Sequence, residues 1–126
     1  MQAIAVAEYI GKESMVMFPF MLVINGSPLP ENHNYNTVGG AKIHIWVMDN
    51  DADSAQERAE SFVKQYLWKI QSVEHVLQIS PEQLQRLHKD EALLYQKALR
   101  NGIAADFLAY PKADGNPDDP ILIGRP

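Results

Sequence analysis

The chain has 126 residues, of which 46% are hydrophobic and 21% charged, so it fits one globular domain with a core of its own. Its formal net charge of −5 gives no attraction to phosphate backbones or anionic lipids, and the absence of cysteine excludes disulfides, thiolate nucleophiles and zinc–cysteine sites. We therefore expect no nucleic-acid partner and no membrane partner. A reducing cytoplasm is the predicted location.

The N-terminal residues do not match a signal peptide, because they lack a basic start and an acidic residue interrupts their short apolar run. The pattern of the domain begins near Met17. We predict an N-terminal extension over residues 1–15, with a short helix packed on the sheet as the alternative. A single α+β domain is then predicted over 16–111, followed by a flexible or edge-strand tail over 112–126.

Two strands are predicted in the first part of the domain. Residues 17–24 form an apolar run typical of a buried strand. Residues 25–40 are rich in Pro, Gly and Asn, which predicts a long loop. Residues 42–48 then alternate as a strand does. One face of this second strand is purely apolar, with Ile43, Ile45 and Val47; the other is mixed, with Lys42, His44, Trp46 and Met48.

An acidic turn leads from the second strand into a helix. Ser54, with Glu57 three residues later, has the pattern of a capping box and predicts a helix over about 55–67. Its apolar side chains recur at helical spacing and are expected to face the core. They are Ala59, Phe62, Val63, Tyr66 and Leu67.

A third strand, a helical region and a last strand follow. Residues 68–79 are strand-like with a change of parity, which predicts a bulge near 72–75. Ser80-Pro81 starts a second helical region that is expected to break at 88–91, with Asp90 as a possible second cap. Asn101-Gly102 ends the helix, and residues 104–110 form the final strand.

The predicted order is thus β-β-α-β-α-β. Such a chain favours an α+β two-layer sandwich, in which a roughly four-stranded sheet carries two helices on one face. This arrangement is ferredoxin-like in style, and a small three-layer α/β fold is the alternative. The layout is similar to that of small bacterial proteins, a similarity that implies no activity.

One candidate ligand pocket follows from this layout. The mixed face of the second strand carries a large side chain, Trp46, that needs a cover, and the 25–40 loop, a partner subunit or a ligand are its candidates. The candidate lining residues combine histidines and aromatic side chains from the loop and two strands. They are His33, Tyr35, His44, Trp46 and His75. His33, His44 and His75 also give the alternative of a three-histidine metal site.

The acidic turn is a second candidate site. Asp49, Asp51, Asp53 and Glu60 have the spacing of positions 1, 3, 5 and 12 of an EF-hand calcium loop. Ser54 stands where that loop needs glycine, and a strand precedes the turn where an EF-hand has a helix. Acidic groups at a helix start are also explained by the helix dipole, which is the interpretation we favour.

The chain carries no recognisable catalytic signature. It has no GxSxG elbow and no glycine-rich phosphate loop, and its serines have no base beside them in a known pattern. We therefore predict a non-enzymatic binding or interaction module without a cofactor that acts as a homodimer. The alternatives are a small enzyme or ligand-binding domain, with its pocket under the 25–40 loop, and a calcium-binding module.

Overall fold

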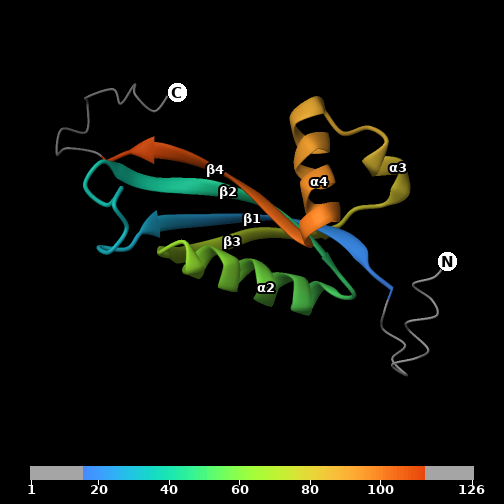
Figure 1. Ribbon diagram of the computed structural model, residues 1–126, viewed down its shortest axis with the longest axis horizontal. Coiled ribbons are helices and arrows are strands. Elements are labelled where there is room, and N and C mark those ends of the chain that lie inside the picture. The colour runs from blue at the N-terminus through green and yellow to red at the C-terminus, as the bar shows by residue number, and fades with distance from the viewer. Residues whose placement is uncertain (1–15, 113–126) are drawn as a thin grey trace.

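The computed structural model describes residues 16–112, so the predictions for residues 1–15 and 113–126 lie outside it. The described elements, in chain order, are β1 (Phe18–Pro28), β2 (Val38–Asp49), α2 (Ala52–Gln65), β3 (Trp68–Gln78), α3 (Pro81–Leu84), α4 (Lys89–Asn101) and β4 (Ile103–Pro111). The strands form one open sheet in the order β3-β1-β2-β4, and every neighbouring pair is antiparallel (Figure 1). The α+β class is therefore confirmed.

The central hairpin of β1 and β2 is longer than its apolar pattern predicts. Both strands extend into the Gly- and Pro-containing stretch, so the connecting loop covers only residues 29–37. In the register, Leu22 lies opposite Ile45 and Val23 lies opposite His44. Because side chains alternate along a strand, each such row belongs to one face of the sheet.

The predicted bulge in β3 is confirmed. Val23 pairs with His75 and Ile24 pairs with Val73, which leaves Glu74 without a register partner on β1. A second shift follows between Asn25 and Gly26. These irregularities reconcile the two halves of β3, whose apolar residues follow opposite parities.

The start of α2 differs from the prediction. Asp51, not Ser54, is the N-cap, and its side chain accepts a hydrogen bond from the backbone N–H of Ser54 at 2.8 Å. An aspartate caps as well as a serine does, and the earlier cap satisfies the backbone donors of a helix that begins at Ala52. The helix ends at Gln65, and Leu67 turns the chain into β3 with a positive φ of 66°.

The second helical region matches its predicted signals in most details. Ser80 and Gln83 form a reciprocal capping box at the start of α3, and the helical region breaks at residues 85–88, earlier than the expected 88–91, because α4 begins at Lys89. His88 is the N-cap of α4, without a side-chain hydrogen bond, so the prediction of Asp90 as the cap is wrong. Gly102 ends α4 in the left-handed conformation with φ 87°, as predicted.

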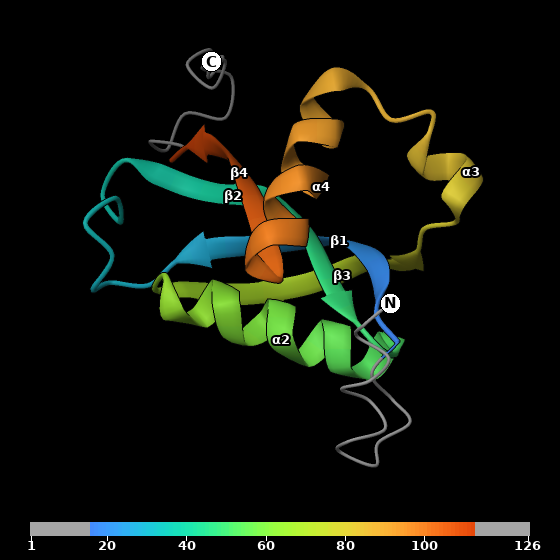
Figure 2. The same cartoon turned by 45° about the vertical axis from the view of Figure 1, so that its right-hand side comes forward.

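The two long helices lie on opposite faces of the sheet, which corrects the expectation that both share one face (Figures 1 and 2). Alternate residues of β2 belong to two separate cores. Ile43, Ile45 and Val47 pack with Ala55, Ala59 and Val63 of α2. Trp46 packs instead with Leu94 and Ala98 of α4. The sheet is therefore covered from both sides, as in the alternative three-layer interpretation, although α4 lies over only one end (Figure 2).

The connections explain why the ferredoxin-like order is not met. The β2-α2-β3 unit is a crossover between parallel strands that passes β1. The α3–α4 segment instead joins β3 to β4, which lie on opposite edges of the sheet and run antiparallel. To reach the other edge, the chain crosses the end of the sheet and places α4 on the second face.

Candidate functional site

Part of the α2 face of the sheet has no helix above it. α2 packs over β3, β2 and β1, whereas β4 extends beyond it at the edge. The side chains that β4 directs to this face are small or apolar and are arranged in one row. They are Ile103, Ala105, Phe107 and Ala109. Their row forms the floor of a groove that runs beside α2.

Four aromatic rings border this groove. The ring of Tyr66 lies 4.8 Å from that of Phe62 and 6.1 Å from that of Phe107. Phe107 in turn lies 5.4 Å from Trp68. All of these pairs are tilted, with interplanar angles between 41° and 45°, a geometry in which ring edges meet ring faces. The cluster joins the end of α2 to the start of β3 and the middle of β4.

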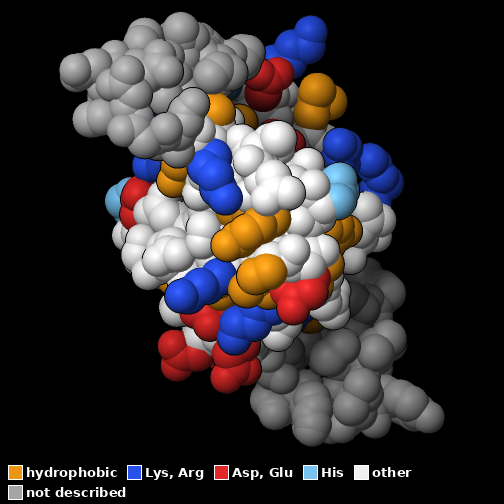
Figure 3. All heavy atoms as spheres, turned by 90° about the vertical axis from the view of Figure 1, so that its left-hand side faces the viewer, with side chains coloured by type: hydrophobic (Ala, Val, Ile, Leu, Met, Phe, Trp, Pro, Cys, Tyr) orange, Lys and Arg blue, Asp and Glu red, His pale blue; other side chains and the backbone are white. Residues whose placement is uncertain are grey.

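The wider part of the groove is an apolar pocket of about 450 Å³. Its lining combines the aromatic cluster with small side chains from β2 and β4, and Asn34 closes one end. The lining comprises Asn34, Val38, Phe62, Tyr66, Trp68, Ala105, Phe107 and Ala109. In the view onto this end of the molecule, apolar side chains lie exposed between groups of charged ones (Figure 3).

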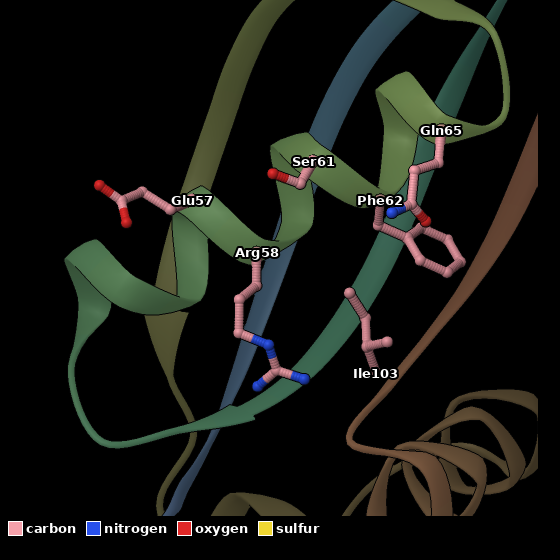
Figure 4. Close-up of a pocket in the computed structure, with 6 residues that line it drawn as sticks. All are labelled: Glu57, Arg58, Ser61, Phe62, Gln65 and Ile103. Atoms are coloured by element: carbon pink, nitrogen blue, oxygen red, sulfur yellow. The ribbon is translucent and has the colours of Figure 1, made fainter.

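A second, more polar pocket of about 370 Å³ adjoins the first. Phe62 lines both, so the two pockets lie next to one another along α2. The other lining residues of this end are Glu57, Arg58, Ser61, Gln65 and Ile103. Figure 4 shows the Phe62 ring and the Ile103 side chain pointing toward one another, with Gln65 beside them. The groove thus offers an apolar body and one end with hydrogen-bonding groups.

Arg58 at this polar end serves to hold the framework together. Its guanidinium donates to the carbonyl of Met48 at 2.7 Å and, at 3.4 Å each, to the Asp49 carboxylate and the carbonyl of Gly102. These bonds connect α2 with the end of β2 and with the turn between α4 and β4. Arg58 therefore sets the separation of α2 and β4, the two sides of the groove.

Asn32 fixes the other end of the groove. This side chain is only 6% exposed, and its amide donates to the carbonyls of Tyr66 and Leu67 at 3.3 and 3.1 Å. Its oxygen accepts from the backbone N–H of Asn34 at 2.9 Å. A buried amide with these bonds ties the 29–37 loop to the turn between α2 and β3. The loop therefore contributes Asn34 to the end of the groove.

The structure divides the five predicted ligand-pocket residues between one face of the sheet, with His44, Trp46 and His75, and the 29–37 loop, with His33 and Tyr35. Trp46 is 2% exposed and lies under α4, where its ring is 5.3 Å from that of Tyr95. His44 and His75 point to the same face, but each pairs with Val23, so one strand lies between them. The 29–37 loop bonds to the α2–β3 turn, and its Tyr35 ring lies 4.2 Å below the Lys112 ammonium. The cover of Trp46 is therefore a helix of the same chain.

The loop carries the last two candidates, His33 and Tyr35, both exposed. The 29–37 loop is hydrogen-bonded to the α2–β3 turn and to Lys112. Within residues 16–112, no group of three or more His, Asp or Glu side chains is placed to hold a metal ion. A pocket under this loop stays a prediction.

The carboxylates of the acidic turn have individual roles in the framework. Asp49 accepts from the N–H of Asn50 at 2.8 Å and pairs with Arg58, and Asp51 caps α2. Glu60 accepts from the Gln56 amide at 2.9 Å, and Asp53 lies in the first turn of α2. These contacts agree with the helix-start interpretation of the turn. Calcium binding there stays a prediction.

Comparison with known proteins adds no family to this description. No family model, curated protein or solved structure matches the chain. The candidate site therefore depends on the geometry alone. Among the described residues, no helix has the length and apolar character that crossing a membrane requires.

The groove was missed in the sequence because its residues resemble core residues. Phe62, Tyr66 and Leu67 follow the helical spacing of the buried Ala59 and Val63, yet Tyr66 and Leu67 are exposed. The feature of the sequence that could have indicated the groove is the width of the apolar stripe on α2. The stripe extends beyond the residues that one sheet contact can bury, and two of its further side chains, Phe62 and Tyr66, line the groove.

Proposed function

We propose that the protein is a non-enzymatic binding module that acts as a homodimer and holds its ligand in the groove between α2 and β4. The observation that carries this proposal is the uncovered row of β4 residues beside an aromatic cluster. Concave, mostly apolar sites with a few polar groups are the usual form of ligand pockets. A volume of about 450 Å³ in the apolar part falls in the range of such sites.

The chemistry of the groove favours a ligand with a flat apolar or aromatic body and a hydrogen-bonding end. Tilted rings at Tyr66 and Phe107 present edges and faces on which another ring packs. Ser61 and Gln65 at the polar end supply a hydroxyl and an amide. Such a ligand is an aromatic small molecule or an aromatic side chain of a partner protein.

Binding rather than catalysis is supported by the groups that line the groove. The described lining residues include no histidine; their titratable groups are Glu57, Tyr66 and Arg58, and the guanidinium of Arg58 is bonded to the framework. General acid–base chemistry uses a positioned group that exchanges protons, most often a histidine. The absence of cysteine from the chain fits the cytoplasmic location that we include in this proposal.

The ligand site is tested with 1-anilinonaphthalene-8-sulfonate, a probe with an aromatic body and an anionic end. We expect saturable binding to the folded protein and an affinity about ten-fold lower for Tyr66→Ser, which removes an aromatic contact of order 1.5 kcal/mol. Leu93→Ser is the matched control, because Leu93 is as exposed as Tyr66 but lies on α4. Fluorescence titration measures both.

Two results argue against this site. If Tyr66→Ser and Leu93→Ser bind the probe as the parent does, the groove is not where the probe binds. If the folded parent protein shows no saturable binding, the groove does not hold aromatic ligands. The homodimer part of the proposal is tested separately by sedimentation across a wide range of protein concentration, where a monomer at every concentration rejects it.

A further inference from the structure

We infer that the homodimer forms by antiparallel pairing of β4 with β4 of a second copy, and that this pairing completes the groove. The inference deepens the proposed function and depends on its homodimer part. β4 pairs with β2 on one side only and is the last strand of the described sheet. An edge strand presents a row of backbone N–H and C=O groups that another strand can pair with.

The edge of β4 lacks the features that usually prevent such pairing. The strand has nine residues, and its register to β2 is regular from Tyr110 back to Ile103. Asp106 is its one charged residue. Leu108 and Tyr110 are 55% and 52% exposed, which is costly for apolar side chains that face water. Charges, bulges and inward-pointing polar groups are the common protections, and this strand has few of them.

The sequence of β4 favours a second copy of the same strand as the partner. In a two-fold antiparallel pair, the register centred on Phe107 uses all nine residues. It places Phe107 opposite Phe107, Ala105 opposite Ala109, and Asp106 opposite Leu108. Aromatic pairs across strands are favourable. A register centred on Asp106 would set two like charges opposite one another, which is unfavourable.

This symmetric pair also changes the groove. The two-fold axis of an antiparallel strand pair is perpendicular to the sheet, so the α2 faces of both copies lie on the same side. The floor formed by Ala105, Phe107 and Ala109 then continues into the same row of the second copy. One apolar trough results, with α2 of one copy on each side. The open side of the groove in a single chain is thereby closed by the partner.

The variant Leu108→Asp tests the proposed surface. In the Phe107-centred register the new carboxylate lies opposite Asp106 of the second copy, twice per dimer, and repels it. Within its own chain, position 108 pairs with Lys42 on β2, so the same carboxylate is accommodated in the monomer. We expect the dimer dissociation constant to rise about ten-fold or more, with a circular dichroism spectrum like that of the parent.

The double variant Asp106→Lys with Leu108→Asp is the rescue. It places a lysine opposite each new aspartate, so we expect the dimer to return. Leu77→Asp is the matched control, because Leu77 is 46% exposed and lies on β3 at the opposite edge of the sheet. Its dissociation constant is expected to equal that of the parent. Sedimentation velocity measures all four proteins.

The register itself is read by cysteine cross-linking, since the chain has no other thiol. Ala105→Cys and Ala109→Cys proteins are oxidised separately and as a mixture. A disulfide is expected mainly in the mixture, where the two thiols face each other. If the parent is a dimer that Leu108→Asp does not weaken, this surface is wrong while the homodimer stands. If the parent is a monomer throughout, the homodimer and this surface both fail.

Discussion

The two edges of the sheet differ in how well they are protected. β3 is interrupted by two register shifts, and it carries the exposed charged residues Lys69 and Glu74. α2 also packs over it. β4 is regular, has one charged residue and extends beyond α2. Bulges and charges make an edge unsuitable for a further strand. The comparison indicates that β3 is the better protected edge of the described sheet, whereas β4 is the edge on which the proposed binding would depend.

The largest loss of unfolding free energy among the variants that compare the two edges is expected from Trp68→Ala. Trp68 begins β3, is buried, and supports the ring of Phe107 across the groove. Removing a buried aromatic side chain costs about 3–5 kcal/mol of unfolding free energy. Phe107→Ala, in the half-buried floor of β4, is expected to cost roughly half as much, because less apolar surface returns to water. Urea denaturation of both variants measures the difference.

Equal losses for Trp68→Ala and Phe107→Ala would break the comparison. When both substitutions are made in the Leu108→Asp protein, in which the proposed dimer is weakened, that outcome would mean that β4 is as deeply embedded as β3 within one chain. A larger loss of unfolding free energy for Phe107→Ala than for Trp68→Ala would contradict the comparison as well.

Most of the elements could be predicted from local signals. The alternation in β2, the bulge in β3, the Ser80 capping box and the Gly102 helix end all depend on neighbouring residues, and all are confirmed. The cap of α2 was misplaced because Asp51 and Ser54 are both good N-caps, and only the helix geometry distinguishes them.

The layers and the groove could not be predicted in this way. Trp46 on the mixed face of β2 indicates that something covers this face, but a helix, a partner and a ligand would leave the same pattern. The choice depends on the path from β3 to β4 across the end of the sheet, which no local motif encodes. The groove in turn depends on how far α2 reaches toward β4, a distance set by the long-range bonds of Arg58.

An intermediate effect is expected from Asn32→Asp at the end of the groove. The carboxylate can still accept from Asn34 but cannot donate to the carbonyls of Tyr66 and Leu67. The Leu67 carbonyl still accepts from the backbone N–H of Leu29, so the main cost is that of a buried carboxylate held against two carbonyl oxygens, about 1–3 kcal/mol. Asn36→Asp is the control, since it makes the same change at an exposed position of the same loop.

The two asparagine variants also test whether the β3 side of the groove depends on the 29–37 loop. Asn32 connects the loop to the β3 side of the groove, so its loss should weaken probe binding as well as stability. Unfolding in urea and fluorescence titration give the two values. A stable Asn32→Asp protein would show that the loop does not depend on this amide.

The smallest effect is expected from Glu74→Gln at the bulge of β3. The Asn25 amide donates to the Glu74 carboxylate at 2.6 Å and the Lys42 ammonium lies 3.2 Å away, and both lower the pKa of Glu74 below its ordinary value. A lowered pKa stabilises the folded state above the ordinary glutamate pKa of about 4.3, and this stabilisation is lost as the pH falls through the folded-state pKa. Glu74→Gln should therefore be slightly less stable than the parent at neutral pH, with a difference that shrinks in acid. Because Glu74 is exposed, the difference in urea midpoint between Glu74→Gln and the parent is expected to be small. A difference that does not change with pH would mean that the bulge is held by its backbone alone.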